Sequence, residues 1–88
     1  MMSPLKQRHP WQWTRCRGLD VPPEWMPTLV ELSDAVAARV TEDLARESFS
    51  WRDIKEKHGS LSIDYSGPDI DDLVDTAIDL IDMANKKR

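Results

Sequence analysis

Apolar residues recur at spacings of three and four between residues 24 and 46. They are Trp25, Leu29, Leu32, Val36, Val40 and Leu44. Because side chains three and four apart share one face of a helix, this spacing predicts one amphipathic helix over the whole range. Pro27 fits its first turn, and the alternative is a start at Thr28, where Thr28 and Glu31 would form a capping box. Trp25 shares the apolar face, which favours the longer helix.

A second amphipathic helix is predicted from about Asp69 to Asn85, after a turn at Ser66-Gly67-Pro68. Its apolar side holds Ile70, Leu73, Val74, Ala77, Ile78, Leu80, Ile81 and Ala84. The opposite side is acidic and holds Asp71, Asp72, Asp75, Asp79 and Asp82. Aspartate is a poorer helix former than glutamate, because its short side chain competes for backbone hydrogen bonds. The acidic side therefore lowers the stability of the helix locally, which makes it the leading candidate for a functional surface.

The segment before Gly59 is compatible with two structures. Ser50 and Asp53 resemble a capping box, and Gly59 suits the position after a helix, so a short helix over 51–58 is one prediction. The other is a β-hairpin that turns at His58 and Gly59. The helical signals are the more numerous, and we favour the short helix.

A strand is predicted after this turn in either case, because apolar and polar residues alternate there. The apolar positions are Leu61, Ile63 and Tyr65. A single strand would leave its backbone groups unpaired, so it needs a neighbour. The neighbour is residues 49–55, the segment near Trp13 or a second copy of the chain.

Residues 1–21 read as an extended basic arm before a globular domain of residues 22–88. The arm contains Pro4 and Pro10, shows no helical period and carries no acid before Asp20. Its side chains of interest are Lys6, Arg8, Trp11, Trp13, Arg15 and Arg17. The rings are expected either to pack as core or oligomer anchors or, less favoured, to contact a partner protein or stack on nucleic-acid bases beside the arginines.

Together these patterns predict one small α+β domain. Two long amphipathic helices pack with a short helix or strand and a β-strand or hairpin. We expect the second helix to pack on the first through Ile70, Leu73, Ala77 and Ile81 against Leu29, Leu32, Val36 and Val40. A chain of 88 residues has a core close to the lower limit for independent stability, so a homodimer or a bound partner would add stability.

The net charge of −4 makes wrapping of nucleic acid an unfavoured function. Cys16 is the sole cysteine, which excludes a disulfide within the chain and favours a reducing compartment. The sequence shows neither a leader-like apolar run nor a stretch that approaches the roughly 18 apolar residues of a membrane span. A cytoplasmic protein of the host cell, without membrane contact, is the resulting expectation.

The acidic side of the second predicted helix is better suited to docking on a partner than to catalysis or metal binding. Asp72, Asp75, Asp79 and Asp82 repeat at helical spacing, but helical carboxylates without histidines or loop ligands make a poor metal site. Cys16 with His9 or His58 is the sole nucleophile and base combination, and a reactive thiol alone does not make an enzyme. We therefore expect no catalysis, no metal and no cofactor. The aspartates form either a docking surface or simply a solvated helix face.

One segment resembles a known group of proteins. Residues 53–66, DIKEKHGSLSIDYS, resemble the (Q/D)-(V/I)-KEKFG-x-LRFYY signature of small phage and prophage proteins. The matching residues are Ile54, Lys55, Glu56, Lys57, Gly59, Leu61 and Tyr65. Arg8-His9-Pro10-Trp11 is similar to an R-Y-P-W arm in that group, and Cys16-Arg17-Gly18 with Trp25 to a later Cys/Gly/Trp segment.

The chain also departs from this group. His58 replaces an aromatic residue, Ser62-Ile63-Asp64 replaces Arg-Phe-Tyr, and the Cys-x-x-Cys tail of many members is absent from the sequence. The resemblance implies a mobile-element accessory protein and no particular activity.

The leading hypothesis is a non-enzymatic phage-type binding protein. Its acidic helix would dock on a basic surface of a host protein and inhibit a nucleic-acid-handling defence complex, by analogy with other small acidic phage proteins. The alternatives are a dimeric nucleic-acid-binding module that uses the arm, or a structural assembly component.

Overall fold

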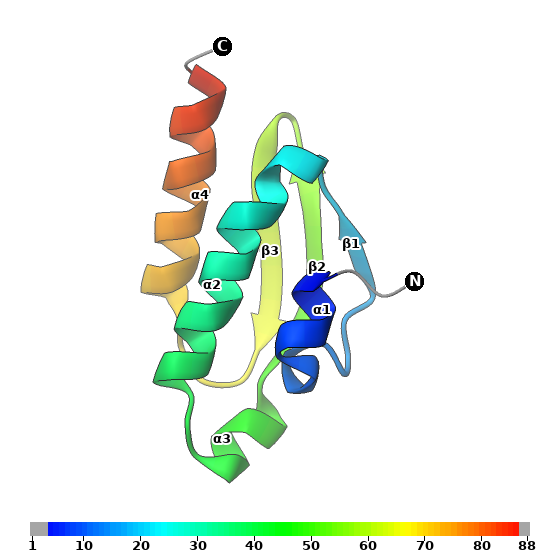
Figure 1. The fold of residues 1–88 in the computed structure, drawn as a ribbon, viewed down its shortest axis with the longest axis vertical. Coiled ribbons are helices and arrows are strands. Elements are labelled where there is room, and N and C mark those ends of the chain that lie inside the picture. Colours follow the sequence, from blue (N-terminus) through cyan, green and yellow to red (C-terminus); the bar gives the residue numbers. More distant parts are fainter. Residues whose placement is uncertain (1–3, 87–88) are drawn as a thin grey trace.

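A three-stranded sheet lies behind a layer of helices in the computed structural model, which describes residues 4–86 (Figure 1). The elements are α1 (Pro4–Arg8), η1 (Pro10–Gln12), β1 (Gly18–Asp20), η2 (Pro23–Trp25), α2 (Met26–Arg39), α3 (Asp43–Ser48), β2 (Ser50–Lys57), β3 (Ser60–Ser66) and α4 (Asp71–Lys86). β2 is the central strand, parallel to β1 and antiparallel to β3. The predicted α+β class is confirmed.

Two antiparallel helices, α2 and α4, lie side by side over the sheet (Figure 1). The predicted packing residues on both helices belong to one core cluster. Val74, Ala77 and Ile81 are buried on α4, as is Ile70 just before it, whereas Leu73 is partly buried. The side of the helix that carries Val74 therefore faces the core more directly than the side that carries Leu73. The predicted packing of the two helices is confirmed.

The first predicted helix is shorter than expected. α2 ends at Arg39, and Leu44, which was expected on its apolar face, lies in the separate helix α3 with 80% of its surface exposed. The break is stabilised by Arg46, whose guanidinium donates to the carbonyl oxygens of Ala37 (3.1 Å) and Val40 (2.8 Å). Carbonyls at a helix end lack partners within the helix, so a side chain that satisfies them favours termination there.

The favoured short helix over 51–58 is wrong, and the hairpin alternative is correct. A β-bulge lies between Trp51 and Asp53, where β2 shifts register against β3. The extra residue, Arg52, lets Trp51 and Ile54 both face the core although they are three positions apart. The bulge therefore imitates the spacing of a helix.

The hairpin turns at two residues with positive φ, His58 (56°) and Gly59 (81°). Two-residue turns with both φ values positive match the twist of the flanking strands, and asparagine is preferred over other non-glycine residues at the first position. Replacing His58 with asparagine should therefore raise the free energy of unfolding by roughly 0.5 kcal/mol. Urea denaturation of the two proteins measures the difference, and His58→Val should move the midpoint the opposite way. An unchanged midpoint in both variants would contradict this account of the turn.

The expected extended arm over 1–21 is wrong for residues 4–21, and residues 1–3 lie outside the described part of the chain. Residues 4–21 fold onto the same core as the rest of the domain through α1, η1 and β1. Leu5 and Gln12 are fully buried and Trp13 is 9% exposed. β1 pairs with β2 from Gly18 opposite Asp53 to Asp20 opposite Lys55. The chain therefore does not divide into an arm and a domain at residue 21.

Candidate partner-binding surface

The first aspartates of α4 help to begin the helix. The hydroxyl of Tyr65 accepts a hydrogen bond from the N–H of Ile70 (3.1 Å) and donates to Asp71. Asp69 accepts from the N–H of Asp71 (2.9 Å). Burial and the bond to Asp71 raise the pKa of Tyr65 to about 12, so the hydroxyl keeps its proton at neutral pH. The carboxylates of Asp69 and Asp71 therefore already accept hydrogen bonds from neighbouring residues of the fold.

Two further aspartates of α4 contact neighbouring elements. Asp72 accepts a hydrogen bond from Arg39 at the end of α2, which holds the pKa of Asp72 below its usual range. This ion pair is exposed on both sides and contributes little to stability. The half-buried Asp82 accepts from the hydroxyl of Ser60 at the start of β3 (3.3 Å).

Asp75 and Asp79 remain exposed, and within residues 4–86 neither carboxylate takes part in a hydrogen bond or an ion pair. Their spacing of four places the Cβ atoms about 6 Å apart on the helix surface. The expected acidic surface therefore has two free carboxylates at its centre, flanked by Asp72 and Asp82, whose charges are already partly engaged.

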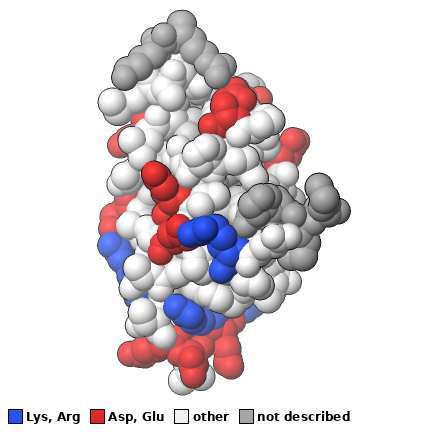
Figure 2. All heavy atoms as spheres, viewed as in Figure 1, with Lys and Arg blue, Asp and Glu red and all other residues white. Residues whose placement is uncertain are grey.

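Exposed apolar side chains lie next to these carboxylates on α4. Leu80 is 46% exposed and Met83 is 58% exposed, whereas most apolar residues of the helix face the core. Figure 2 shows the helix layer from the front, with acidic side chains interrupting an otherwise largely uncharged upper surface and basic side chains in the lower half. α4 thus presents acidic and apolar groups together.

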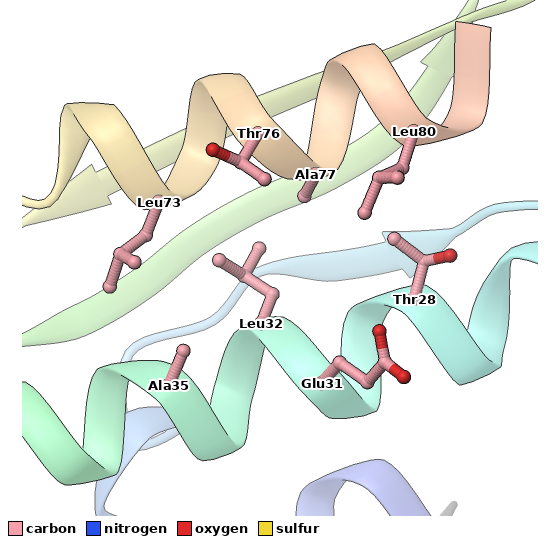
Figure 3. A pocket seen from close by; sticks show the side chains of 8 residues that line it. All are labelled: Thr28, Glu31, Leu32, Ala35, Leu73, Thr76, Ala77 and Leu80. Atoms are coloured by element: carbon pink, nitrogen blue, oxygen red, sulfur yellow. The ribbon is translucent and has the colours of Figure 1, made fainter. Parts of the chain in front are cut away.

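An apolar groove runs between α2 and α4 (Figure 3). It has a volume of about 170 Å³ and is lined by Thr28, Glu31, Leu32, Ala35, Leu73, Thr76, Ala77 and Leu80. The small side chains of Ala35 and Ala77 leave the space that larger residues would fill. This groove was not among the features predicted from the sequence, although alanines on the facing sides of two packed helices are a pattern that indicates such a space.

The tryptophans of the N-terminal segment pack against other aromatic side chains. Trp13 is buried against Trp51, with ring centres 6.1 Å apart. Trp11 is half-buried between Phe49 (5.9 Å) and the guanidinium of Arg46 (4.7 Å). These contacts agree with the favoured expectation that both rings pack, and their use as partner contacts or base-stacking groups stays a prediction.

The two arginines named with them lie at the surface. Arg15 donates from its guanidinium to the backbone oxygen of Glu47 (2.8 Å), and the backbone N–H of Arg17 donates to Arg52 (2.7 Å). Both side chains are exposed. They supply exposed positive charge, and the nucleic-acid hypothesis that uses them stays a prediction.

The candidate nucleophile and bases make separate contacts. Cys16 donates from its thiol to the carbonyl of Gly18 (3.4 Å), and His9 bonds with Asp34 (2.8 Å). His58 occupies the hairpin turn. Within residues 4–86, no group of three or more histidine, cysteine, aspartate or glutamate side chains is placed to hold a metal ion. No helix in this range combines the length and apolar character needed to cross a membrane.

Comparison with known proteins found no matching family model, no matching curated protein and no matching solved structure.

Proposed function

We propose that this chain is a non-enzymatic binding protein that docks on a basic surface of another protein through the outer face of α4. The observation that carries the proposal is the coincidence of free carboxylates and exposed apolar side chains on one helix. Asp75 and Asp79 supply the charge, and Leu80 and Met83 supply the apolar area. Protein interfaces combine an apolar centre with polar surroundings, whereas a surface that is only solvated has no need of the apolar part.

Rigidity supports the same proposal. The opposite side of α4 is anchored in the core by Val74, Ala77 and Ile81, and Ile70 just before the helix is buried as well. The helix therefore presents its acidic side chains in fixed relative positions, which lowers the entropy cost of association. Residues 71–85 contain no base, so the helix attracts a basic partner over distances up to about 8 Å at physiological salt.

The partner that we propose is a nucleic-acid-handling defence complex of a bacterial host. Surfaces that bind phosphates are basic, so an acidic helix complements them and competes with the nucleic acid. The resemblance of residues 53–66 to phage and prophage proteins supports a host protein as the target. A homodimer stays a prediction beside this one.

Replacing both Asp75 and Asp79 with asparagine tests the proposal. The fold should persist, because neither carboxylate bonds within the described structure, and affinity for the partner should fall at least about tenfold. The partner is captured from a bacterial lysate with the tagged chain, identified by mass spectrometry and purified. Titration calorimetry at low and physiological salt then measures the affinity.

The matched control changes two exposed acids outside α4, Asp20→Asn and Glu56→Gln. It removes the same total charge from β1 and β2. Equal losses of affinity in the control and in the Asp75/Asp79 variant would show that only net charge matters. An unchanged affinity in the Asp75/Asp79 variant would leave the aspartates as a solvated helix face.

A further inference from the structure

The groove between α2 and α4 is open along its length and adjoins the free carboxylates. Leu73, Ala77 and Leu80 point into it from α4, and Leu32 points into it from α2 (Figure 3). Leu73 and Leu80 are seven residues apart, which corresponds to about 10 Å along the helix axis. This length accommodates roughly two turns of an opposing helix with apolar side chains at spacings of three and four.

Acidic groups stand on both sides of this groove. On the α2 side, Glu31 is exposed and its carboxylate lies beside the apolar lining (Figure 3). On the α4 side, Asp72 and Asp79 lie next to the lining residue Thr76, because they are four positions before it and three positions after it on the helix. Arg39, the one base in the described part of the two helices before Lys86, is already bonded to Asp72. The groove therefore has an apolar floor and acidic flanks.

We propose that this groove binds the apolar face of a basic amphipathic helix of the partner protein. Two or three apolar side chains of that helix fill the space above Ala35 and Ala77. Its lysines or arginines pair with Glu31 on one side and Asp79 on the other. The inference rests on the proposed function and specifies the part of the partner that α4 recognises.

Charge decides against a second copy of this chain as the occupant. A symmetric dimer through the groove would bring the acidic flanks of one copy, with Glu31, Asp72 and Asp79, against the acidic flanks of the other. Like charges brought together at an interface oppose association. A helix with the opposite flanking charge gains from the same arrangement.

Synthetic peptides test the groove without a known partner. The probe is a fluorescent, helix-forming 14-residue peptide with leucines at helical spacing and lysines on both flanks. Its control has the same composition in scrambled order, so both carry the same charge. Fluorescence anisotropy against the full chain should show binding of the patterned peptide at least about tenfold tighter than that of the scrambled one. Equal binding of both peptides would overturn the proposal.

Substitution of Leu80 locates the binding site. Leu80→Asn removes one apolar wall at a half-exposed position and should weaken binding of the patterned peptide about tenfold. Thr76→Phe, a change at an exposed lining position, should weaken it by filling the groove. The matched control is Leu44→Asn on α3, outside the groove, which should leave binding unchanged.

The outcomes separate the two proposals. If Leu80→Asn and Thr76→Phe bind as wild type while Asp75→Asn with Asp79→Asn loses affinity, the groove is not the site and the acidic docking surface stands. If the aspartate changes do not affect the captured partner, the proposed function fails whatever the peptides do. Sedimentation that shows a dimer dissociated by Leu80→Asn would assign the groove to a second copy and overturn the helix proposal.

Discussion

Replacing Gly67 with alanine should lower the free energy of unfolding by at least about 3 kcal/mol. Gly67 has a φ of 108°, which L side chains rarely adopt. A Cβ atom there would lie 2.6 Å from the Cα of Phe49 and 2.8 Å from the carbonyl oxygen of Ser48. Both are backbone atoms, and Phe49 is fully buried, so relief of the clash requires the β3–α4 turn to move away from the core.

Gly59 provides a matched control for this change. It also has a positive φ, 81°, but no atom lies within 4 Å of a Cβ built on it. Gly59→Ala should therefore cost only the backbone strain, about 1 kcal/mol. Chemical denaturation followed by tryptophan fluorescence compares the two variants. Equal losses would show that the close approach of Gly67 to Phe49 is unimportant.

The second large effect is expected at Gln12, a fully buried amide in the N-terminal segment. Its nitrogen donates to the backbone oxygen of Ser33 (2.9 Å). Its oxygen accepts from the hydroxyl of Ser33 (2.7 Å) and from the indole N–H of Trp51 (2.9 Å). Gln12→Leu keeps the approximate volume but leaves these groups without their partner. We expect a loss of about 3 kcal/mol, since each buried unsatisfied group costs about 1–3 kcal/mol.

A double-mutant cycle with Ser33→Ala distinguishes lost hydrogen bonds from poor packing. Ser33→Ala alone removes one bond to Gln12, and in the Gln12→Leu background that bond no longer exists. The serine change should therefore cost less in the double variant than in the wild type. Strictly additive losses, measured by urea denaturation, would contradict the hydrogen-bond explanation.

Hydrophobic periodicity predicted the helix and the strand whose apolar residues recur at the regular spacing of that element. The residues from Asp71 to Asn85 repeat at helical spacing and pack one face on a core, so α4 was predictable. The alternation of Leu61, Ile63 and Tyr65 predicted β3 for the same reason. β2 was predicted as a helix because its bulge at Arg52 shifts the alternation of apolar and polar residues by one position. A local pattern contains no sign of such an insertion.

The wrong predictions for the end of α2 and for the N-terminal segment have a different cause, which is contacts between residues that are distant in the sequence. The end of α2 depends on Arg46, whose side chain reaches back to the carbonyls of Ala37 and Val40. The burial of Gln12 depends on its hydrogen bonds to Ser33 and Trp51, far along the chain. The basic charge and the prolines of residues 1–21 suggested an exposed arm. Neither feature shows that this segment contacts residues far along the chain.

The candidate site was predictable in position but not in detail. Helical spacing placed the aspartates of α4 on one side, and all but Asp82 are exposed. The engagement of Asp72 by Arg39 required the antiparallel packing of two helices, which the sequence does not encode locally. The groove beside them required the same packing.

The parallel pairing of β1 with the central strand has a consequence for synthesis of the chain. Residues 18–20 leave the ribosome early, but their hydrogen-bonding partners, residues 53–55, follow only after α2 and α3. Until then Leu5, Gln12 and Trp13 lack part of the core that they enter, because Phe49 and Trp51 are also still to come. Parallel pairing over such a separation forms slowly compared with the local β2–β3 hairpin. The newly made N-terminal segment is therefore the part of the chain most exposed to aggregation or chaperone binding.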